Sequence, residues 1–305
     1  MKKPTKFKQA TVTTSPPSAG NTKRVERAVL KTLSYRAIFN YPLSFHQLQN
    51  YLLTKKPISR QDLAGVLPEL EVRGRVVQSD GRYHLKKIEP VSWRGGSESS
   101  MALIQKAQKI SKTLVRLPWI KFIGVTGSVA AFNAAEQDDI DVLIIAEKKR
   151  LWITRGFVFL ILKILGELRK DSAPNQRICP NILLDETSLP WSRKNRNVYV
   201  AHEIVMLYPI FDRDETYLKF LQANSWVLRF FGNLKFSKPV ESVSQSPAKN
   251  ILDLVESVAR NLQLNYMKPK RTTEVTKENI IHFNRDDHTK KFLSEFERVK
   301  MKELV

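Results

Sequence analysis

Residues 120–146 constrain the fold most, because they encode two buried strands joined by a glycine turn. Ile120 to Val125 is an apolar, β-rich run that stops at Gly127-Ser128, and the alanine-rich residues 130–135 favour a turn or two of helix. The run from Asp139 to Ile145 is typical of a second buried strand that carries two carboxylates. The stretch therefore predicts a strand, a tight turn, a short helix and a strand.

Four polar or small residues in this stretch indicate a chemistry. Asp139 and Asp141 are two positions apart, so on a strand they share one face, where they repel each other unless a cation lies between them. Mg²⁺ suits carboxylate oxygens combined with substrate phosphate oxygens. Gly127 has no Cβ and lets a ligand approach the backbone, while Ser128 begins a helix whose free N–H groups favour a phosphate. We expect a phosphate-binding loop beside a metal platform.

The spacing of these residues resembles a known signature. Gly127-Ser128, ten residues, and then Asp139-Ile140-Asp141 is similar to the Gly-Ser…Asp-x-Asp pattern of the DNA polymerase β-like nucleotidyltransferase superfamily. The resemblance implies an Mg²⁺-dependent enzyme, with a two-metal site at Asp139 and Asp141. It also implies that Gly127 and Ser128 bind the β/γ-phosphates of a nucleoside triphosphate, such as ATP. The alternative is an ordinary α/β unit with a chance aspartate pair.

The reaction implied by the resemblance moves a nucleoside monophosphate to an acceptor hydroxyl and releases pyrophosphate. The superfamily normally adds a third carboxylate from a neighbouring strand, which acts as general base. Asp185 ends a strand predicted over residues 178–185 and is the candidate, so the expected catalytic set is Asp139, Asp141 and Asp185. Asn181 shares its face in a more central position, and if Asn181 is the true match the base is absent. Asp185 is equally well explained as an acidic turn residue.

The N-terminal quarter predicts a separate unit. Residues 1–21 form a disordered basic tail, and residues 22–88 then predict three helices and a hairpin with its turn at Asp80-Gly81. This order resembles a winged helix-turn-helix domain, whose third helix enters the major groove in DNA-binding examples. The third helix here, residues 60–73, mixes arginines with acidic side chains, so binding to DNA or RNA and a purely structural role remain alternatives.

The remaining chain predicts an α+β protein. Residues 89–99 and 235–249 are expected linkers, residues 100–234 a nucleotidyltransferase-type mixed sheet with flanking helices, and residues 250–305 a mostly helical C-terminal region. The full order resembles a group of bacterial nucleotidyltransferase-domain proteins with an N-terminal winged helix. That likeness implies the fold and leaves the substrate open.

Several further polar side chains have two interpretations. A helix predicted to start near residue 151 is flanked by cations that could meet a triphosphate or simply be solvated (Lys148, Lys149, Arg150 and Arg155). His202-Glu203, on a later helix, could hold a nucleotide or orient a metal, although a structural pair is the favoured interpretation.

Charge and cysteine content indicate the partners and the compartment. The 305 residues carry 51 Lys and Arg against 30 Asp and Glu, a net charge of +21 that favours a polyanionic partner such as nucleic acid. The single cysteine, Cys179, excludes an internal disulfide and fits a reducing cytoplasm. The most apolar run, residues 157–162, is too short to cross a bilayer, so no membrane partner is expected.

Two functions from different classes follow. The first is the nucleotidyltransferase described above. The second is a winged-helix regulator that binds nucleic acid and retains a degenerate nucleotide-binding fold without transfer activity.

Overall fold

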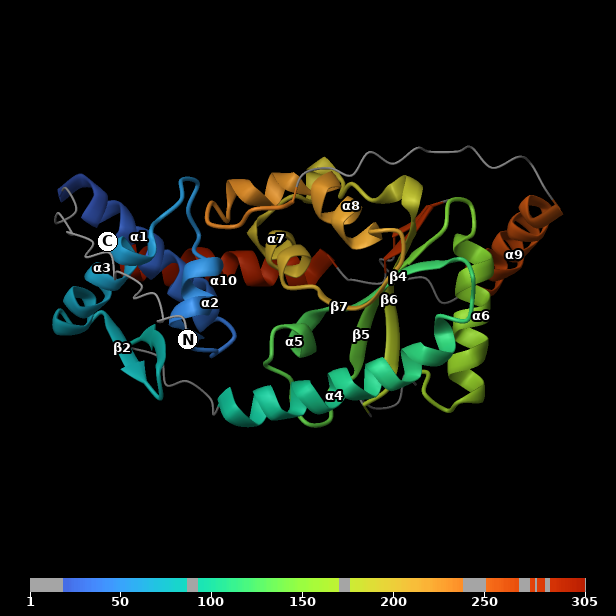
Figure 1. The fold of residues 1–305 in the computed structure, drawn as a ribbon, viewed down its shortest axis with the longest axis horizontal. Coiled ribbons are helices and arrows are strands. Elements are labelled where there is room, and N and C mark those ends of the chain that lie inside the picture. Colours follow the sequence, from blue (N-terminus) through green and yellow to red (C-terminus); the bar gives the residue numbers. More distant parts are fainter. Residues whose placement is uncertain are drawn as a thin grey trace, which may run out of the picture.

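A mixed six-stranded sheet with helices on both faces forms the centre of the molecule. The computed structural model describes residues 19–86, 93–169, 176–237, 251–268, 275–277, 279–282 and 286–304. The strand order is β7-β4-β5-β6-β9-β8, and a second, three-stranded sheet lies with α1–α3 at the N-terminal end (Figure 1). The fold is therefore α+β, as expected. None of the described helices combines the length and apolar character that a bilayer-spanning segment needs.

The N-terminal elements agree with their local sequence signals. They are α1 (Ala19–Ala37), β1 (Leu43–Ser44), α2 (Phe45–Asn50), α3 (Arg60–Val72), β2 (Val76–Ser79) and β3 (Arg82–Leu85). Ser44 and Gln47 form a capping box at the start of α2, and Ser59 caps α3. Asp80 and Gly81 have φ values of 50° and 71°, the left-handed pair that a tight hairpin turn needs. The three helices and the hairpin predicted for residues 22–88 are present.

Two boundaries of the predicted segments differ in the structure. The helix α1 begins at Ala19, before the predicted end of the tail, and residues 1–18 lie outside the described residues. The helix α4 spans Trp93–Leu114, so the predicted linker 89–99 is helical from Trp93 onward. Packing accompanies the second difference: Ser100 of α4 is buried, and its hydroxyl accepts a 3.1 Å hydrogen bond from the Ala134 N–H.

The central sheet is built around the stretch singled out in the sequence. Its elements are β4 (Ile120–Val125), α5 (Gly127–Ala130), β5 (Ile140–Ala146), α6 (Leu151–Ile164), β6 (Ile178–Asp185), α7 (Val198–Val205), β7 (Tyr208–Asp212) and α8 (Thr216–Ala223). Short 3₁₀ turns occupy Glu186–Ser188, Arg193–Asn195 and Ser225–Arg229 (η1–η3). The strand β4 is antiparallel to both neighbours, while β5 and β6 are parallel and joined through α6.

Alternation along the strands separates two apolar layers. One set of side chains, including Ile140, Val142 and Ile144, packs with α4 and α6. The other, including Leu143 and Ile145, packs with α7 and η3. Figure 1 shows α4 along one side of the sheet and α7 and α8 on the other. Asp141 has the same parity as Leu143 and Ile145, so its side chain lies on the α7 side.

The described part of the C-terminal segment is mostly helical, and it contacts both ends of the molecule. Its elements are α9 (Ile251–Met267), β8 (Val275–Lys277), β9 (Ile280–His282) and α10 (Asp286–Leu304). The helix α9 packs on α6, β9 extends the central sheet beside β6, and α10 runs along α1 (Figure 1). The predicted linker 235–249 falls mostly on residues 238–250, which lie outside the described residues.

Candidate functional site

The Gly127-Ser128 turn lies directly against the aspartate strand. Gly127 has a φ of 67°, and a Cβ built on it would lie 3.3 Å from the Asp141 Oδ2 atom. Only glycine adopts this left-handed backbone without strain while leaving the carboxylate room. The Ser128 hydroxyl donates a hydrogen bond of 2.8 Å to Asp138 Oδ2, which also accepts one of 3.1 Å from the Ala135 backbone N–H. Asp138 therefore holds the turn and its following loop together.

Asp139 and Asp141 lie at the start of β5, where β6 also begins. Asp139 immediately precedes the strand, and its Oδ1 atom accepts a 3.1 Å hydrogen bond from the Arg177 backbone N–H. Its Oδ2 atom forms a 3.1 Å ion pair with Arg169 Nε. The structure thus brings the predicted residues Gly127, Ser128, Asp139 and Asp141 together in one site.

Cys179 stands beside Asp141 on the neighbouring strand. The two residues are paired in the parallel register of β5 and β6, so their side chains share a face. Burial raises the pKa of the Cys179 thiol to about 12, and the Asp141 charge adds to this, so the thiol is protonated and donates to the Asp141 carboxylate. Arg169 Nη1 lies 3.7 Å from the Cys179 sulfur and links the thiol to Asp139.

The helix α7 brings another carboxylate to the same place. The Gly127 backbone N–H donates a hydrogen bond to Glu203, and the Glu203 and Asp141 charges interact. Tyr199 lies one helical turn earlier, and its phenol pKa is raised by burial and then by the Glu203 charge. Glu203 therefore joins the site from the helix layer that covers this face of the sheet.

The site holds more negative charge than its surroundings neutralise. Burial raises the pKa of Asp141 to about 6; the Cys179 hydrogen bond and Arg169 oppose the rise, and Asp139 and Asp138 add to it. Burial, followed by the Asp141 charge, raises the pKa of Glu203 to about 7, against the opposing effect of the Gly127 N–H. Both shifts mean that a bound cation would be favoured here.

The donor set suits Mg²⁺ more than a softer metal. Asp139 and Asp141 offer carboxylate oxygens, and Mg²⁺ is commonly held by one or two carboxylates together with substrate phosphates. Arg169, whose side chain is 51% exposed, engages Asp139 and can move into solvent when a cation takes its place. Among the described residues, no group of three His, Cys, Asp or Glu side chains is arranged to enclose a metal by itself. A metal here would depend on oxygens from the substrate.

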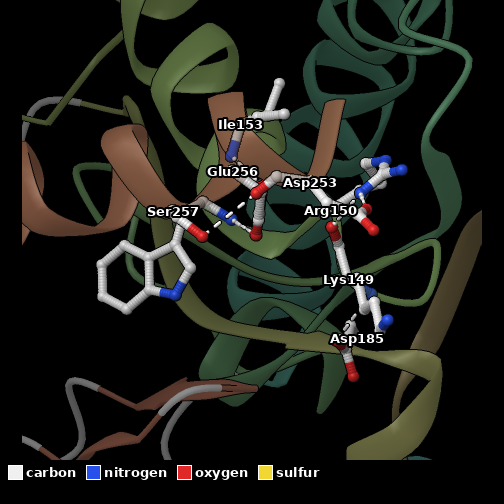
Figure 2. A network of polar contacts seen from close by, with 8 residues as sticks. Lys149, Arg150, Ile153, Asp185, Asp253, Glu256 and Ser257 are labelled. Atoms are coloured by element: carbon white, nitrogen blue, oxygen red, sulfur yellow. Dashed lines mark hydrogen bonds and ion pairs between the residues drawn. The ribbon is translucent and has the colours of Figure 1, made fainter. Parts of the chain in front are cut away.

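Asp185 lies at the other end of β6, and the structure does not bring it together with the other predicted site residues. Register pairs Asp141 with Cys179 and Asp185 with Ala146, so roughly 20 Å of strand separates Asp185 from Asp141. Asp185 is fully buried, and its carboxylate accepts from the Thr187 N–H at 2.9 Å and the Lys149 N–H at 3.1 Å (Figure 2). It acts as a cap. Asn181 is the bulge residue that the β5–β6 register skips.

Two of the four cations near the start of α6, Arg150 and Arg155, serve the packing of α9. Arg150 forms a 2.8 Å ion pair with Asp253, and the Arg155 guanidinium donates to Gln263 at 2.6 Å. Glu256 accepts hydrogen bonds from the backbone N–H groups of Trp152 and Ile153, at 2.7 and 2.9 Å. Figure 2 shows Glu256 and Asp253 reaching this helix end. A side-chain carboxylate thus takes the place that a triphosphate was considered for.

His202 has a structural role. Its ring is buried, stacks on Tyr35 with centroids 3.8 Å apart, and bonds through Nδ1 to the Val198 carbonyl at 2.9 Å. Burial lowers the His202 pKa to about 3, so the ring is neutral. The adjacent Glu203 faces the aspartates instead. His202 is therefore a core residue, whereas Glu203 is a site residue.

Sequence reasoning missed Asp138, Arg169 and Cys179 as site residues and favoured a structural role for Glu203. Asp138 extends the aspartate run by one residue, which is a signal available in the sequence. Arg169 and Glu203 reach the site only through tertiary packing. In comparisons with protein-family models, curated proteins and solved structures, no match to this chain was found.

Proposed function

We propose that the chain is an Mg²⁺-dependent nucleotidyltransferase that moves a nucleoside monophosphate from a nucleoside triphosphate to an acceptor hydroxyl. The observation that carries the proposal is the convergence of the Gly127-Ser128 turn, the Asp139 and Asp141 carboxylates and Glu203 at one end of β5. A glycine turn beside clustered carboxylates suits a metal-bound polyphosphate.

Each residue has a role in this proposal. Bound Mg²⁺ would be held by Asp139 and Asp141 and would neutralise charge on the phosphates. Gly127 leaves room for the β/γ-phosphates, and the exposed Ser128 hydroxyl turns from Asp138 to a phosphate oxygen. Arg169, released from Asp139, pairs with the same phosphates.

Glu203 replaces Asp185 as the proposed general base. The acceptor oxygen attacks the α-phosphorus, the bond from that phosphorus to the bridging oxygen of the β-phosphate breaks, and pyrophosphate leaves. The hydroxyl proton passes to the Glu203 carboxylate, whose pKa of about 7 suits proton transfer near neutral pH. Its position beside Asp141 supports this assignment.

The arrangement of elements also supports the proposal. A mixed sheet with the glycine turn between two antiparallel strands and the next strand parallel is consistent with a nucleotidyltransferase-type core. Three helices and a three-stranded sheet at the N-terminus are consistent with a winged helix-turn-helix unit. We propose both identities for these parts, with a nucleoside triphosphate as one partner and nucleic acid as a second.

A second candidate function is a regulator with a degenerate transferase fold. One observation favours it: Cys179 stands beside Asp141, where the resemblance implies a third carboxylate. In that case the site binds a nucleotide without transferring it. A thiol with a pKa near 12 cannot act as a base at neutral pH. The two functions differ in whether Glu203 supplies the general base that Cys179 cannot provide.

A labelling screen tests the proposal. Purified protein is incubated with Mg²⁺ and each of the four ribonucleoside triphosphates, labelled in the α-phosphate, together with total cellular RNA or protein extract. Transfer of label that depends on Mg²⁺ and is lost in Glu203→Gln supports the enzyme. Binding of a labelled nucleotide without transfer under every condition supports the regulator, and neither binding nor transfer contradicts both.

A further inference from the structure

A basic pocket lies between the N-terminal helices and the segment that follows α8. It has a volume of about 320 Å³, within the roughly 300–1,000 Å³ range of small-molecule sites. Its lining is drawn from three places in the chain: Lys31 of α1, the Leu53–Lys55 loop, and residues around η2 and η3 (Arg196, Trp226, Arg229 and Phe230). None of these residues belongs to the site around Asp141.

The pocket is held open by backbone bonds across the seam. The Thr54 N–H donates to the Phe230 carbonyl at 2.9 Å, and the Gly232 N–H donates to the Thr54 carbonyl at 2.8 Å. A Cβ at Gly232 would lie 2.8 Å from the Lys55 carbonyl oxygen, so glycine is needed where the two segments meet. Asn233 adds side-chain bonds to the Ile58 N–H and the Gln49 carbonyl, both at 2.7 Å. The walls are therefore fixed before any ligand arrives.

Four cations surround an apolar floor. Lys31, Lys55, Arg196 and Arg229 line the pocket, and no lining residue among those described carries a carboxylate. Arg196 lies over the Trp226 ring, 5.4 Å from its centroid, and donates its Nε hydrogen to the Trp191 carbonyl, which fixes its guanidinium. Within the described residues, none of these four cations has a carboxylate at ion-pair distance.

The positive charge inside the pocket is only partly compensated. Burial lowers the pKa of Lys31, and the neighbouring cations Lys300, Arg27 and Lys55 act in the same direction, while Glu297 opposes them. Glu297 is itself paired with Lys300. Clustered cations repel one another and destabilise the folded protein unless an anion lies among them. Phosphate groups suit this role, because their oxygens accept several charge-assisted hydrogen bonds.

We propose that this pocket binds the phosphate groups of a nucleotide or of a nucleic-acid strand, as a site separate from the one around Asp141. Lys31, Lys55, Arg196 and Arg229 contact phosphate oxygens, and Leu53 and Phe230 contact the sugar or base. The proposal does not depend on nucleotidyl transfer, because it rests on another set of residues.

A charge-swap experiment on the full chain tests this site. Binding is measured in EDTA, to remove any contribution from Mg²⁺, with fluorescent single-stranded RNA and duplex DNA and, separately, with ATP and inorganic pyrophosphate. The test variant is Lys55→Glu with Arg229→Glu, since both side chains are exposed. The matched control is Lys112→Glu with Lys163→Glu, which changes the net charge equally at exposed positions on α4 and α6.

The proposal predicts that Lys55→Glu with Arg229→Glu weakens binding at least about tenfold and lowers its salt dependence, while the control changes affinity less than about threefold. Loss confined to RNA or DNA identifies a strand as the ligand, and loss confined to ATP and pyrophosphate identifies a small phosphorylated molecule. The proposal is overturned if both variants weaken binding equally, or if neither variant weakens it.

Two companion variants distinguish a loss of folding from a loss of binding, and the pocket from the site around Asp141. Lys55→Gln with Arg229→Gln removes the charges more gently, and it should show the same order of effects if the charge swap unfolds the protein. Asp141→Asn should not reproduce the loss caused by Lys55→Glu with Arg229→Glu, because the two sites share no residue. That result keeps a failure of the transferase proposal distinguishable from a failure of this one.

Discussion

At the scale of single residues, the site is a cluster of carboxylates whose ionised forms are disfavoured by burial and by one another. Glu203 has a folded-state pKa of about 7 against about 4.3 in an unfolded chain. Between these two values the folded protein keeps a proton that the unfolded chain releases, so stability falls as the pH rises from about 4 to about 7 and then levels off. A bound cation would offset this loss of stability, because it favours the ionised form of the carboxylate.

The first prediction concerns Glu203→Gln. Glutamine can still accept the Gly127 N–H bond but cannot ionise, so the variant should be more stable than wild type at pH 8, by on the order of a few kcal/mol. At pH 4 the two should match. Thermal melts at both pH values measure this, with the exposed Glu98→Gln as control. A gap of the same size at pH 4 and pH 8 would refute the assignment.

The second prediction separates Asp185 from catalysis. Asp185→Ala leaves the Lys149 and Thr187 N–H groups without their buried acceptor, at a cost of about 1–3 kcal/mol per unsatisfied group. Turnover per folded molecule should stay within about threefold of wild type, because Asp185 touches nothing in the site. Urea denaturation and activity are compared on the same preparation. A fall of about 100-fold in turnover of the folded protein would restore Asp185 as a catalytic residue.

At the scale of elements, the start of α6 shows how a segment distant in sequence is held against the helices of the central sheet. The helix α6 has no side-chain cap from its own N-cap residue, Arg150. Glu256 of α9 supplies the missing acceptor instead (Figure 2). A cap that comes from another helix couples the two elements, because neither end is satisfied without the other.

The third prediction tests that coupling. Glu256→Ala should cost about 1–2 kcal/mol, since two buried N–H groups lose their partner. Glu256→Gln should cost less, because one oxygen remains. Glu295→Ala, which removes a surface pair with Arg298, should change stability by less than about 1 kcal/mol. Urea denaturation gives the order; equal costs for Glu256→Ala and Glu295→Ala would remove the capping role.

At the scale of the whole molecule, α10 ties the N-terminal helices to the central sheet. It packs along α1, and Phe296 is buried with an edge contact to Tyr35, which in turn stacks on His202 of α7. One apolar cluster thus contains residues from both ends of the chain and from the sheet. The two parts should unfold as one cooperative unit.

The fourth prediction follows from that cluster. Phe296→Ala should destabilise the protein by about 3–5 kcal/mol, because it opens a cavity between α1, α7 and α10. Met301→Ala, at a position 60% exposed on the same helix, is the control and should cost less than about 1 kcal/mol. Denaturation followed by two probes measures both. Separate transitions for the N-terminal helices and the sheet in wild type would contradict a shared core.

Local patterns predicted the elements well, and packing decided the rest. The strands at Ile120 and Ile140 and the Asp80-Gly81 turn follow from periodicity and backbone preference. Asp185 was misplaced because a strand's sequence does not reveal which end lies beside another strand's carboxylates; register does. Glu203 was undervalued because its partner, the Gly127 N–H, is far away in sequence.

Nucleotidyl transfer by this chain requires the Asp139 and Asp141 carboxylates, and an isosteric substitution can remove the charge of Asp141 while keeping its shape. Release of pyrophosphate from a nucleoside triphosphate, in the presence of Mg²⁺ and the RNA or protein extract that supplies the acceptor hydroxyl, is measured for wild type, Asp141→Asn and Asp214→Asn. Asp214 is an exposed aspartate paired with Lys121. We expect a loss of at least about 100-fold for Asp141→Asn and wild-type release for Asp214→Asn. Equal release by all three proteins would contradict it.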